Sequence, residues 1–402
     1  MFRLSRRRSW IVRSALALAF SAPLSLAHAG SFKRLYSFTG QKDGGYPGYG
    51  SLVRDAKGNL YGTTQAINGY TDGTVFELAP DGTETVLYTF EDEAAGFGPE
   101  ALVRDSKGNL WGTACCGGGY GAGVVFELKP DGKESIIHDF AGPTGDGGTP
   151  YSALLIGKGG DFYGTTAEGG EYYSGTVFRL RPGGKETILH SFKNGRDGRN
   201  AFPGLIADSK GNMYGTTVEG GGKSSSGTVF EITPAGAKTL LYAFRGAPKD
   251  GELPTGGVVM DAAGNLYGIT FAGGLSGCSW TGQEGCGTVF KLAPDGKETI
   301  LHFFTGRHGD GGNPVTGLTL DSAGNLYGTT EYGGSRCSVT QHGCGTVFEI
   351  AQDGTETILH SFKTDDGAEL QTRLTLDGSG NLYGGAIAGG KYGYGTIFEI
   401  TP

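Results

Sequence analysis

The chain has 402 residues, of which 78 are glycine and 18% are charged, and its formal net charge at pH 7 is −8. The first 29 residues carry five arginines and no acidic residue, so the remainder is more acidic still. An acidic chain repels nucleic acid and anionic membrane surfaces, which excludes both as expected partners. Because no apolar stretch is long enough to cross a bilayer, we also expect no membrane span.

The N-terminal segment has the three parts of a cleavable export signal. A basic start is followed by an apolar stretch from about Ala15 to Ala27 and by small residues before a predicted cut after Ala29. Arg7 and Arg8, followed by Ser-Trp-Ile, also fit the twin-arginine pattern, so the general and the twin-arginine routes both stay open. We expect residues 1–29 to be a signal peptide and residues 30–402 to form one periplasmic or secreted domain.

Two short phrases recur seven times in register. GNLYG or a near copy begins at Gly58, Gly108, Gly160, Gly211, Gly264, Gly324 and Gly380. GTVF or a near copy begins at Gly73, Gly123, Gly175, Gly227, Gly287, Gly345 and Gly395. Regular spacing at intervals of 50 to 60 residues is the signature of a repeat fold.

Each repeat contains four predicted β segments, which in the first copy cover residues 52–55, 59–64, 73–78 and 84–90. The segments are rich in Val, Leu, Thr, Tyr and Phe and are bounded by Gly, Asn, Asp and Pro. Seven four-stranded units predict an all-β fold, a seven-bladed β-propeller with almost no helix. The competing architecture, a solenoid, needs atypical capping repeats at its ends, and the repeats here are alike.

The fourth segment follows its repeat only six times, because the last repeat ends after GTIFEITP. A seventh copy stands at the front of the chain, in residues 32–38. We therefore predict that strand 32–38 pairs with strand 395–400, which closes the ring and removes both open sheet edges.

The phrases GTVFEL and PDGKETILH resemble the GloVer tandem-repeat family of exported bacterial proteins, often described with a choice of anchor. The resemblance covers essentially the whole chain after the predicted signal. It implies an exported propeller and assigns no catalytic residue. Members often carry a variable C-terminal anchor, and this chain departs from that pattern because it ends at the last blade.

Six cysteines form three even pairs, which in an exported protein predict disulfides. Cys278 and Cys286 flank one loop, Cys337 and Cys344 flank the equivalent loop of the next repeat, and Cys115 and Cys116 are adjacent. We predict all three disulfides. No Cys-x-x-Cys spacing occurs and no histidine stands at zinc-ligand distance, so we expect no metal site.

The loops after the second and fourth segments should share one face, and these loops vary while the turns of the other face recur almost unchanged. Because binding residues concentrate on variable loops held by a rigid scaffold, we place any site on the variable face. The recurring Asp before each Gly-Asn turn, such as Asp55, is expected to cap that turn. The fourth-segment histidines and the Asp-Gly of the fourth-to-first loops are expected to serve packing and turns, with Ca²⁺ the one cofactor left open.

His308 and His342 depart from the repeat and should be neighbours on the variable face. Their loops also hold Arg307, Asp310, Glu331, Tyr332 and Arg336. A histidine that moves protons beside arginines that hold an anion would form a binding or catalytic cluster. Aromatic side chains on other loops of that face could stack on sugars; they include Trp280, Tyr172 and Tyr173.

Two functions stay open. The first is a non-catalytic exported propeller, expected to be monomeric, that binds glycan or protein through the variable face. The second is a polysaccharide-degrading enzyme at the same face. A lyase would use Arg307 or Arg336 with a base such as His308, His342 or Tyr332. A glycoside hydrolase would need two facing carboxylates, with Glu331, Glu168 and Glu219 as candidates. The absence of GxSxG and HExxH favours binding.

Overall fold

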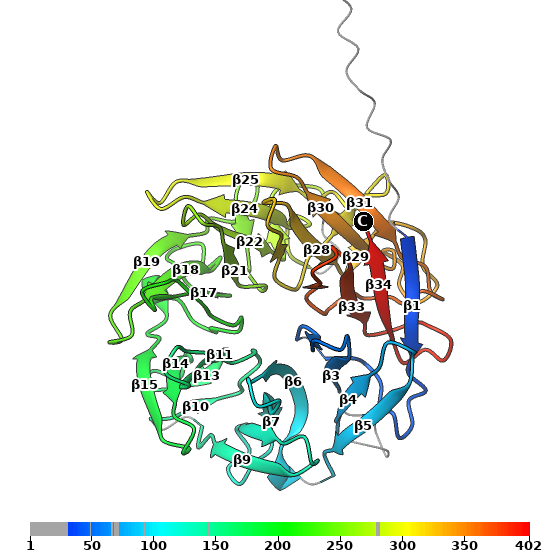
Figure 1. The fold of residues 1–402 in the computed structure, drawn as a ribbon. Helices are drawn as coiled ribbons and strands as arrows, with labels where there is room; N and C mark the ends of the chain where they lie inside the picture. Colours follow the sequence, from blue (N-terminus) through cyan, green and yellow to red (C-terminus); the bar gives the residue numbers. More distant parts are fainter. Residues whose placement is uncertain are drawn as a thin grey trace, which may run out of the picture.

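A computed structural model describes residues 31–48, 50–65, 67, 72–91, 93–142, 145–278 and 282–402. Seven four-stranded antiparallel sheets stand around a central opening, which confirms the predicted seven-bladed β-propeller (Figure 1). The helical elements of the described residues are two 3-10 turns, η1 (Glu93–Ala95) and η2 (Gly195–Asp197). In this part of the chain, none of the helices has the length and apolarity needed to cross a membrane. The predicted signal peptide lies outside the described residues.

The blades are numbered in chain order. Within each blade, the first strand lies nearest the centre of the ring and the fourth strand lies at the rim (Figure 1). Blade one has β2 (Val53–Arg54), β3 (Leu60–Thr64), β4 (Thr74–Leu78) and β5 (Glu84–Thr89). Blade two has β6 (Phe97–Arg104), β7 (Leu110–Cys116), β8 (Val124–Leu128) and β9 (Glu134–Asp139). Blade three has β11 (Leu155–Ile156), β12 (Phe162–Thr166), β14 (Thr176–Leu180) and β15 (Glu186–Ser191). Blade four has β16 (Ile206–Ala207), β17 (Met213–Thr217), β18 (Thr228–Ile232) and β19 (Lys238–Ala243).

The remaining blades repeat the pattern. Blade five has β21 (Val258–Met260), β22 (Leu266–Thr270), β24 (Thr288–Leu292) and β25 (Glu298–Phe303). Blade six has β27 (Thr319–Leu320), β28 (Leu326–Thr330), β30 (Thr346–Ile350) and β31 (Glu356–Ser361). Blade seven has β32 (Thr375–Leu376), β33 (Leu382–Ala386), β34 (Thr396–Thr401) and β1 (Ser31–Ser37). Three small sheets link loops: β10 (Gly147–Gly148) with β13 (Glu168–Gly169), β20 (Gly251–Glu252) with β23 (Ala272–Gly273), and β26 (Gly311–Gly312) with β29 (Tyr332–Gly333).

The glycine of the Tyr-Gly-Thr phrase leaves room for an aromatic ring. A Cβ at Gly62 would lie 2.6 Å from Cζ of Phe76, the ring that faces it across the second and third strands. Such a distance is inside van der Waals contact, so any larger residue would displace the ring. This close approach explains why the glycine recurs in the second strand of every repeat.

Phenylalanine rings join each blade to the next. The fully buried phenylalanine after the fourth strand packs edge-on against the third-strand phenylalanine of the following blade, with centroids 4.9 to 5.3 Å apart. The seven pairs are Phe38–Phe76, Phe90–Phe126, Phe140–Phe178, Phe192–Phe230, Phe244–Phe290, Phe304–Phe348 and Phe362–Phe398. Edge-to-face pairs add about 0.5–1.5 kcal/mol each beyond the area they bury.

The N-terminal strand closes the ring as predicted. β1 pairs antiparallel with β34, from Ser31 opposite Thr401 to Ser37 opposite Thr396, and lies beside it in Figure 1. The chain continues to Phe38, which packs against blade one. Blade seven is therefore completed by the two ends of the described chain.

The predicted capping of the Gly-Asn turns is confirmed. In blade one, the Asp55 carboxylate accepts hydrogen bonds from the backbone N–H groups of Lys57 at 2.8 Å and Asn59 at 2.9 Å. Burial alone would raise the pKa of Asp55, but these bonds and one from the Tyr61 hydroxyl hold it below its usual value. The same turn geometry recurs around the ring, so this face is a structural surface.

Two of the three predicted disulfides are present, Cys278–Cys286 and Cys337–Cys344. The third prediction was wrong, because Cys115 and Cys116 are free thiols with their Sγ atoms 2.7 Å apart. A disulfide bond is about 2.05 Å long, and adjacent cysteines can reach that distance only by straining the peptide between them.

Candidate functional site

The structure brings together three of the residues predicted in blade six. The rings of Tyr332 and His342 meet edge to face, with centroids 5.9 Å apart. Glu331, directly before β29, is buried and accepts a hydrogen bond from Nε2 of Gln371 at 3.0 Å. Burial, and then the nearby Glu369 carboxylate, raise the pKa of Glu331. These residues form a small polar group between blades six and seven.

The other predicted residues of these loops point elsewhere. Arg307, His308 and Arg336 are exposed, and Nη2 of Arg307 donates to the backbone oxygen of Gly277 at 3.1 Å. Asp310 accepts a hydrogen bond from the backbone N–H of Thr305 and faces the rim of the ring. The polar group therefore gathers Glu331, Tyr332 and His342, while the other four side chains face solvent or the rim.

The predicted aromatic side chains lie in a different part of the face. Tyr172 and Tyr173 belong to the loop after β13 in blade three, across the ring from blade six, and are 39% and 66% exposed (Figure 1). The Lys193 ammonium lies over the Tyr172 ring, 5.2 Å from its centroid. The predicted Trp280 lies outside the described residues. The predicted site residues are thus spread over several blades.

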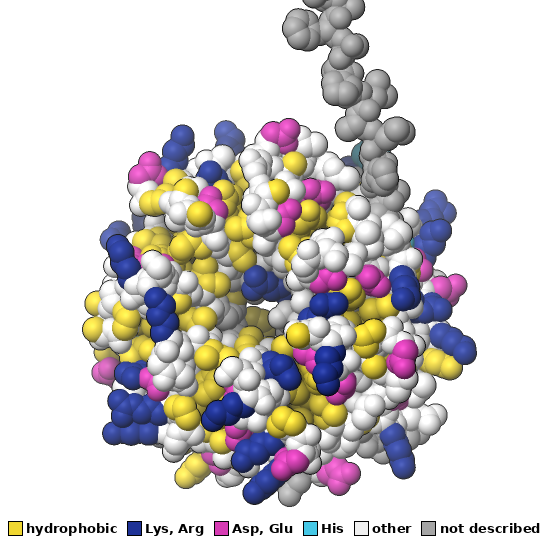
Figure 2. All heavy atoms as spheres, viewed as in Figure 1, with side chains coloured by type: hydrophobic (Ala, Val, Ile, Leu, Met, Phe, Trp, Pro, Cys, Tyr) yellow, Lys and Arg dark blue, Asp and Glu magenta, His cyan; other side chains and the backbone are white. Residues whose placement is uncertain are grey.

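A cavity of about 390 Å³ occupies the centre of the ring, where the first strands of the blades face one another. Figure 2 shows the molecule hollowed at this point, with Lys or Arg side chains at the edge of the hollow. The volume is within the range of pockets that take small-molecule ligands, about 300–1,000 Å³. The cavity is therefore large enough to take a small ligand.

One side chain breaks the symmetry of the cavity wall. The innermost position of each repeat holds Ser51, Ala101, Ala153, Gly204, Gly257, Gly317 and Arg373. The six small residues leave the centre open, and Arg373 of blade seven reaches into it. Among the described residues, no hydrogen bond or ion pair reaches the Arg373 guanidinium, and burial lowers its pKa. A half-buried guanidinium without a partner favours an anion.

The rest of the wall offers a flat surface and a hydroxyl group. The rings of Tyr151 and Phe202 pack together with centroids 4.5 Å apart, and both line the cavity. Thr255 also lines it, and its buried Oγ1 has no hydrogen-bond partner among the described residues. A buried hydroxyl without a partner is costly, so these groups suit a ligand with a carboxylate, an apolar face and hydroxyl groups.

Sequence reasoning missed Arg373 because the residue belongs to no motif and stands just before β32, where no site was expected. The signal was present in the repeats, where one arginine stands in a column of serine, alanine and glycine. Only the closed ring shows that this column lines a cavity.

Solved structures similar to this chain share its fold. One is the extracellular domain of a protein described as a putative hybrid two-component system from B. thetaiotaomicron, with 14% identity, a TM-score of 0.58, and coverage of 93% of this chain and 41% of that one. A second extracellular domain from the same organism, of a protein described as a putative one-component system, has 10% identity and a TM-score of 0.54, covering 91% of this chain and 39% of that one. A fungal alcohol oxidase solved with copper has 15% identity and a TM-score of 0.55, covering 93% of this chain and 76% of that one. This chain thus spans about two fifths of the length of the two bacterial extracellular domains.

No curated protein matches this sequence. A profile of the Gloeobacter/Verrucomicrobia repeat matches residues 24–145, 49–281 and 275–402, which together cover all four-stranded units of the ring. The chain therefore belongs to the Gloeobacter/Verrucomicrobia repeat family.

Proposed function

We propose that the protein is an exported binding protein that takes the acidic end of a saccharide into the central cavity. The observation that carries this proposal is Arg373, a guanidinium without a described partner at a position that is small in the other six repeats. A guanidinium binds a carboxylate through two parallel hydrogen bonds. The two disulfides support export, because disulfides persist in oxidising compartments.

A sugar fits the other walls of the cavity. The paired rings of Tyr151 and Phe202 offer an apolar surface for a sugar face, and the Thr255 hydroxyl offers a hydrogen bond. The net charge of −8 opposes a densely charged polymer. A uronic acid unit, with one carboxylate, therefore matches the cavity better than a polyanion.

The proposal is tested by calorimetric titration of the mature protein with glucuronate and with glucose. We expect glucuronate to bind and glucose to bind at least about tenfold more weakly, because the charged hydrogen bonds contribute about 1.5–3 kcal/mol. Arg373→Gln should remove the preference. Arg336→Gln, which neutralises an exposed loop arginine, is the matched control and should leave binding unchanged.

Loss of glucuronate binding in Arg336→Gln with retention in Arg373→Gln would instead place the ligand on the loops. A melting curve for each variant separates loss of a ligand contact from loss of folding. If glucuronate does not bind to a folded wild-type protein, the proposal is wrong.

The alternative, a polysaccharide-degrading enzyme, draws on one observation in blade six. Glu331 has a raised pKa and lies near Glu369, and a glycoside hydrolase needs one protonated and one ionised carboxyl group. Incubation with acidic and neutral polysaccharides distinguishes the two functions. If the wild-type protein releases reducing ends and Glu331→Gln does not, the result would favour the enzyme.

A further inference from the structure

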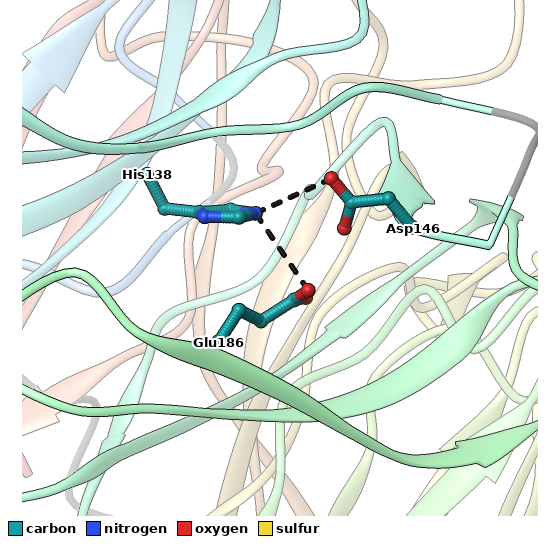
Figure 3. A group of neighbouring side chains, drawn as sticks. All are labelled: His138, Asp146 and Glu186. Atoms are coloured by element: carbon teal, nitrogen blue, oxygen red, sulfur yellow. Dashed lines mark ion pairs between the residues drawn. The ribbon is translucent and has the colours of Figure 1, made fainter.

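At the rim of the ring, neighbouring blades meet through a recurring set of three side chains. The first is a tyrosine or histidine of a fourth strand, and the second is an aspartate of the loop that follows it. The third is the residue that begins the fourth strand of the next blade. Blades two and three meet through His138, Asp146 and Glu186 (Figure 3), and blades five and six meet through His302, Asp310 and Glu356.

At two other junctions a tyrosine takes the place of the histidine and donates a hydrogen bond to the aspartate. Between blades four and five, the Tyr242 hydroxyl donates to Oδ2 of Asp250 at 3.0 Å. Tyr36 donates to Asp43 in the same way at the junction of blades seven and one. A phenol supplies its own proton to the aspartate, so these junctions have a neutral donor where the other two have an imidazole.

The junction between blades three and four supplies its own cation. Lys238 replaces the glutamate there, and its Nζ lies 2.9 Å from Oδ1 of Asp197. Nε2 of His190 lies 3.0 Å from the other oxygen of the same carboxylate, a normal hydrogen-bond distance. At the ring closure, Phe32 takes the place of the glutamate and stacks on His360 at 4.2 Å.

In the two His-Asp-Glu sets, the imidazole nitrogen stands too far from the carboxylates for hydrogen bonds. Nε2 of His138 is 3.5 Å from Oδ2 of Asp146 and 3.8 Å from Oε2 of Glu186. In the second set both distances are 3.5 Å. The Nε2 atoms of His138 and His302 are both buried and have no hydrogen-bond partner among the described residues.

These distances are close to the edge of a tetrahedron around a metal ion. Ligand atoms about 2.0–2.2 Å from a zinc ion lie about 3.3–3.6 Å from one another. In each set, one nitrogen and two carboxylate oxygens lie within 4.8 Å of one another. The dashed lines in Figure 3 converge on the imidazole nitrogen from both carboxylates.

We propose that His138, Asp146 and Glu186 form a divalent-metal site, and that His302, Asp310 and Glu356 form a second, equivalent one. One imidazole and two carboxylates, with water as fourth ligand, match the preferences of Zn²⁺; Ca²⁺ prefers six to eight oxygen ligands. Each ion would join two blades, as the Lys238 ammonium does at its own junction.

The charges in the set of His138, Asp146 and Glu186 favour a cation. Burial, and then the neighbouring Asp146, raise the pKa of Glu186 to about 9. Burial opposes ionisation of Asp146 too, but contact with His138 and the Ala141 backbone N–H lowers its pKa to about 2. The two partly buried carboxyl groups of this set lie close together beside the His138 nitrogen, and a bound dication would stabilise both as anions.

The test is calorimetric titration of the chelator-treated mature protein with Zn²⁺ alone. Cys115→Ser and Cys116→Ser are built into every variant, because free thiols also bind zinc. We expect two ions per chain, one in His138→Tyr, and none in the variant that also carries His302→Tyr. Tyrosine occupies this position naturally at other junctions, so these variants should fold.

A gain of binding gives a second readout. Tyr242→His completes a His-Asp-Glu set with Asp250 and Glu298 and should raise the number of bound ions to three. Glu186→Lys copies the Lys238 junction and should lose one ion without lowering the melting temperature. Two ions still bound by the folded double tyrosine variant, or no zinc binding by the parent protein, would overturn the proposal.

Discussion

The carboxyl groups of Glu84 and Glu298 make the rim junctions sensitive to pH. Both lie beside a tyrosine-aspartate pair, and burial, followed by the charge of Asp43 or Asp250, raises the pKa of each to about 7. Since the folded pKa exceeds the unfolded value, the contribution of these groups to stability is fully present below about pH 4.5. It is lost as the pH rises through about 7.

We predict that Glu298→Gln removes part of this pH dependence. Glutamine keeps the shape of the side chain without the ionisation, so the variant should exceed the wild type in free energy of unfolding at pH 8. The advantage should vanish near pH 4.5. Urea unfolding at both pH values in the presence of a chelator measures this, with the exposed Glu171→Gln as control. An equal pH dependence in wild type and Glu298→Gln would contradict the assignment.

Single residues were predictable from the sequence where their partners are local. Asp55 caps a turn four residues long, so the repeat itself showed its role. His138 and Glu186 come from neighbouring blades, and the sequence shows each only in its own repeat. The expected packing role of the histidines was incomplete for this reason: their rings pack on phenylalanine, while their nitrogens face carboxylates of the next blade.

At the scale of elements, strand β1 determines whether the ring is closed. It supplies the fourth strand of blade seven, and Phe38 after it fills the junction with blade one. We predict that deletion of Ser31–Phe38 lowers the free energy of unfolding by at least about 3 kcal/mol, the minimum cost of removing a buried phenylalanine. Thermal melting compares this variant with a chain that begins at Ser31. Equal melting temperatures would show that β1 does not close the ring.

Strand number, order and closure could be predicted because seven copies of one pattern report the same structure. The free state of the adjacent cysteines could not be predicted. An even number of cysteines in an exported protein favours a disulfide, while the local backbone geometry opposes one. Cys115 and Cys116 end strand β7, and the extended backbone there keeps their sulfur atoms 2.7 Å apart. An even number of cysteines predicts disulfide pairs, but the backbone geometry determines which pairs can form a bond.

At the scale of the whole molecule, the cavity that we propose as the site lies apart from the loops to which the sequence pointed. Variable loops drew attention to Glu331, Tyr332 and His342, which do meet. The small residues of the innermost column leave the cavity open, and its volume arises only when seven blades close. Closure of the ring places the Arg373 side chain in a cavity, whereas the same side chain on an open sheet would face water.

The most direct measurement is a crystal structure of the protein soaked with glucuronate. The proposed function predicts the sugar in the central cavity, with its carboxylate within hydrogen-bond distance of the Arg373 guanidinium and its ring against Tyr151 and Phe202. A sugar bound at the loops around Tyr332 and His342, with none in the cavity, would contradict it.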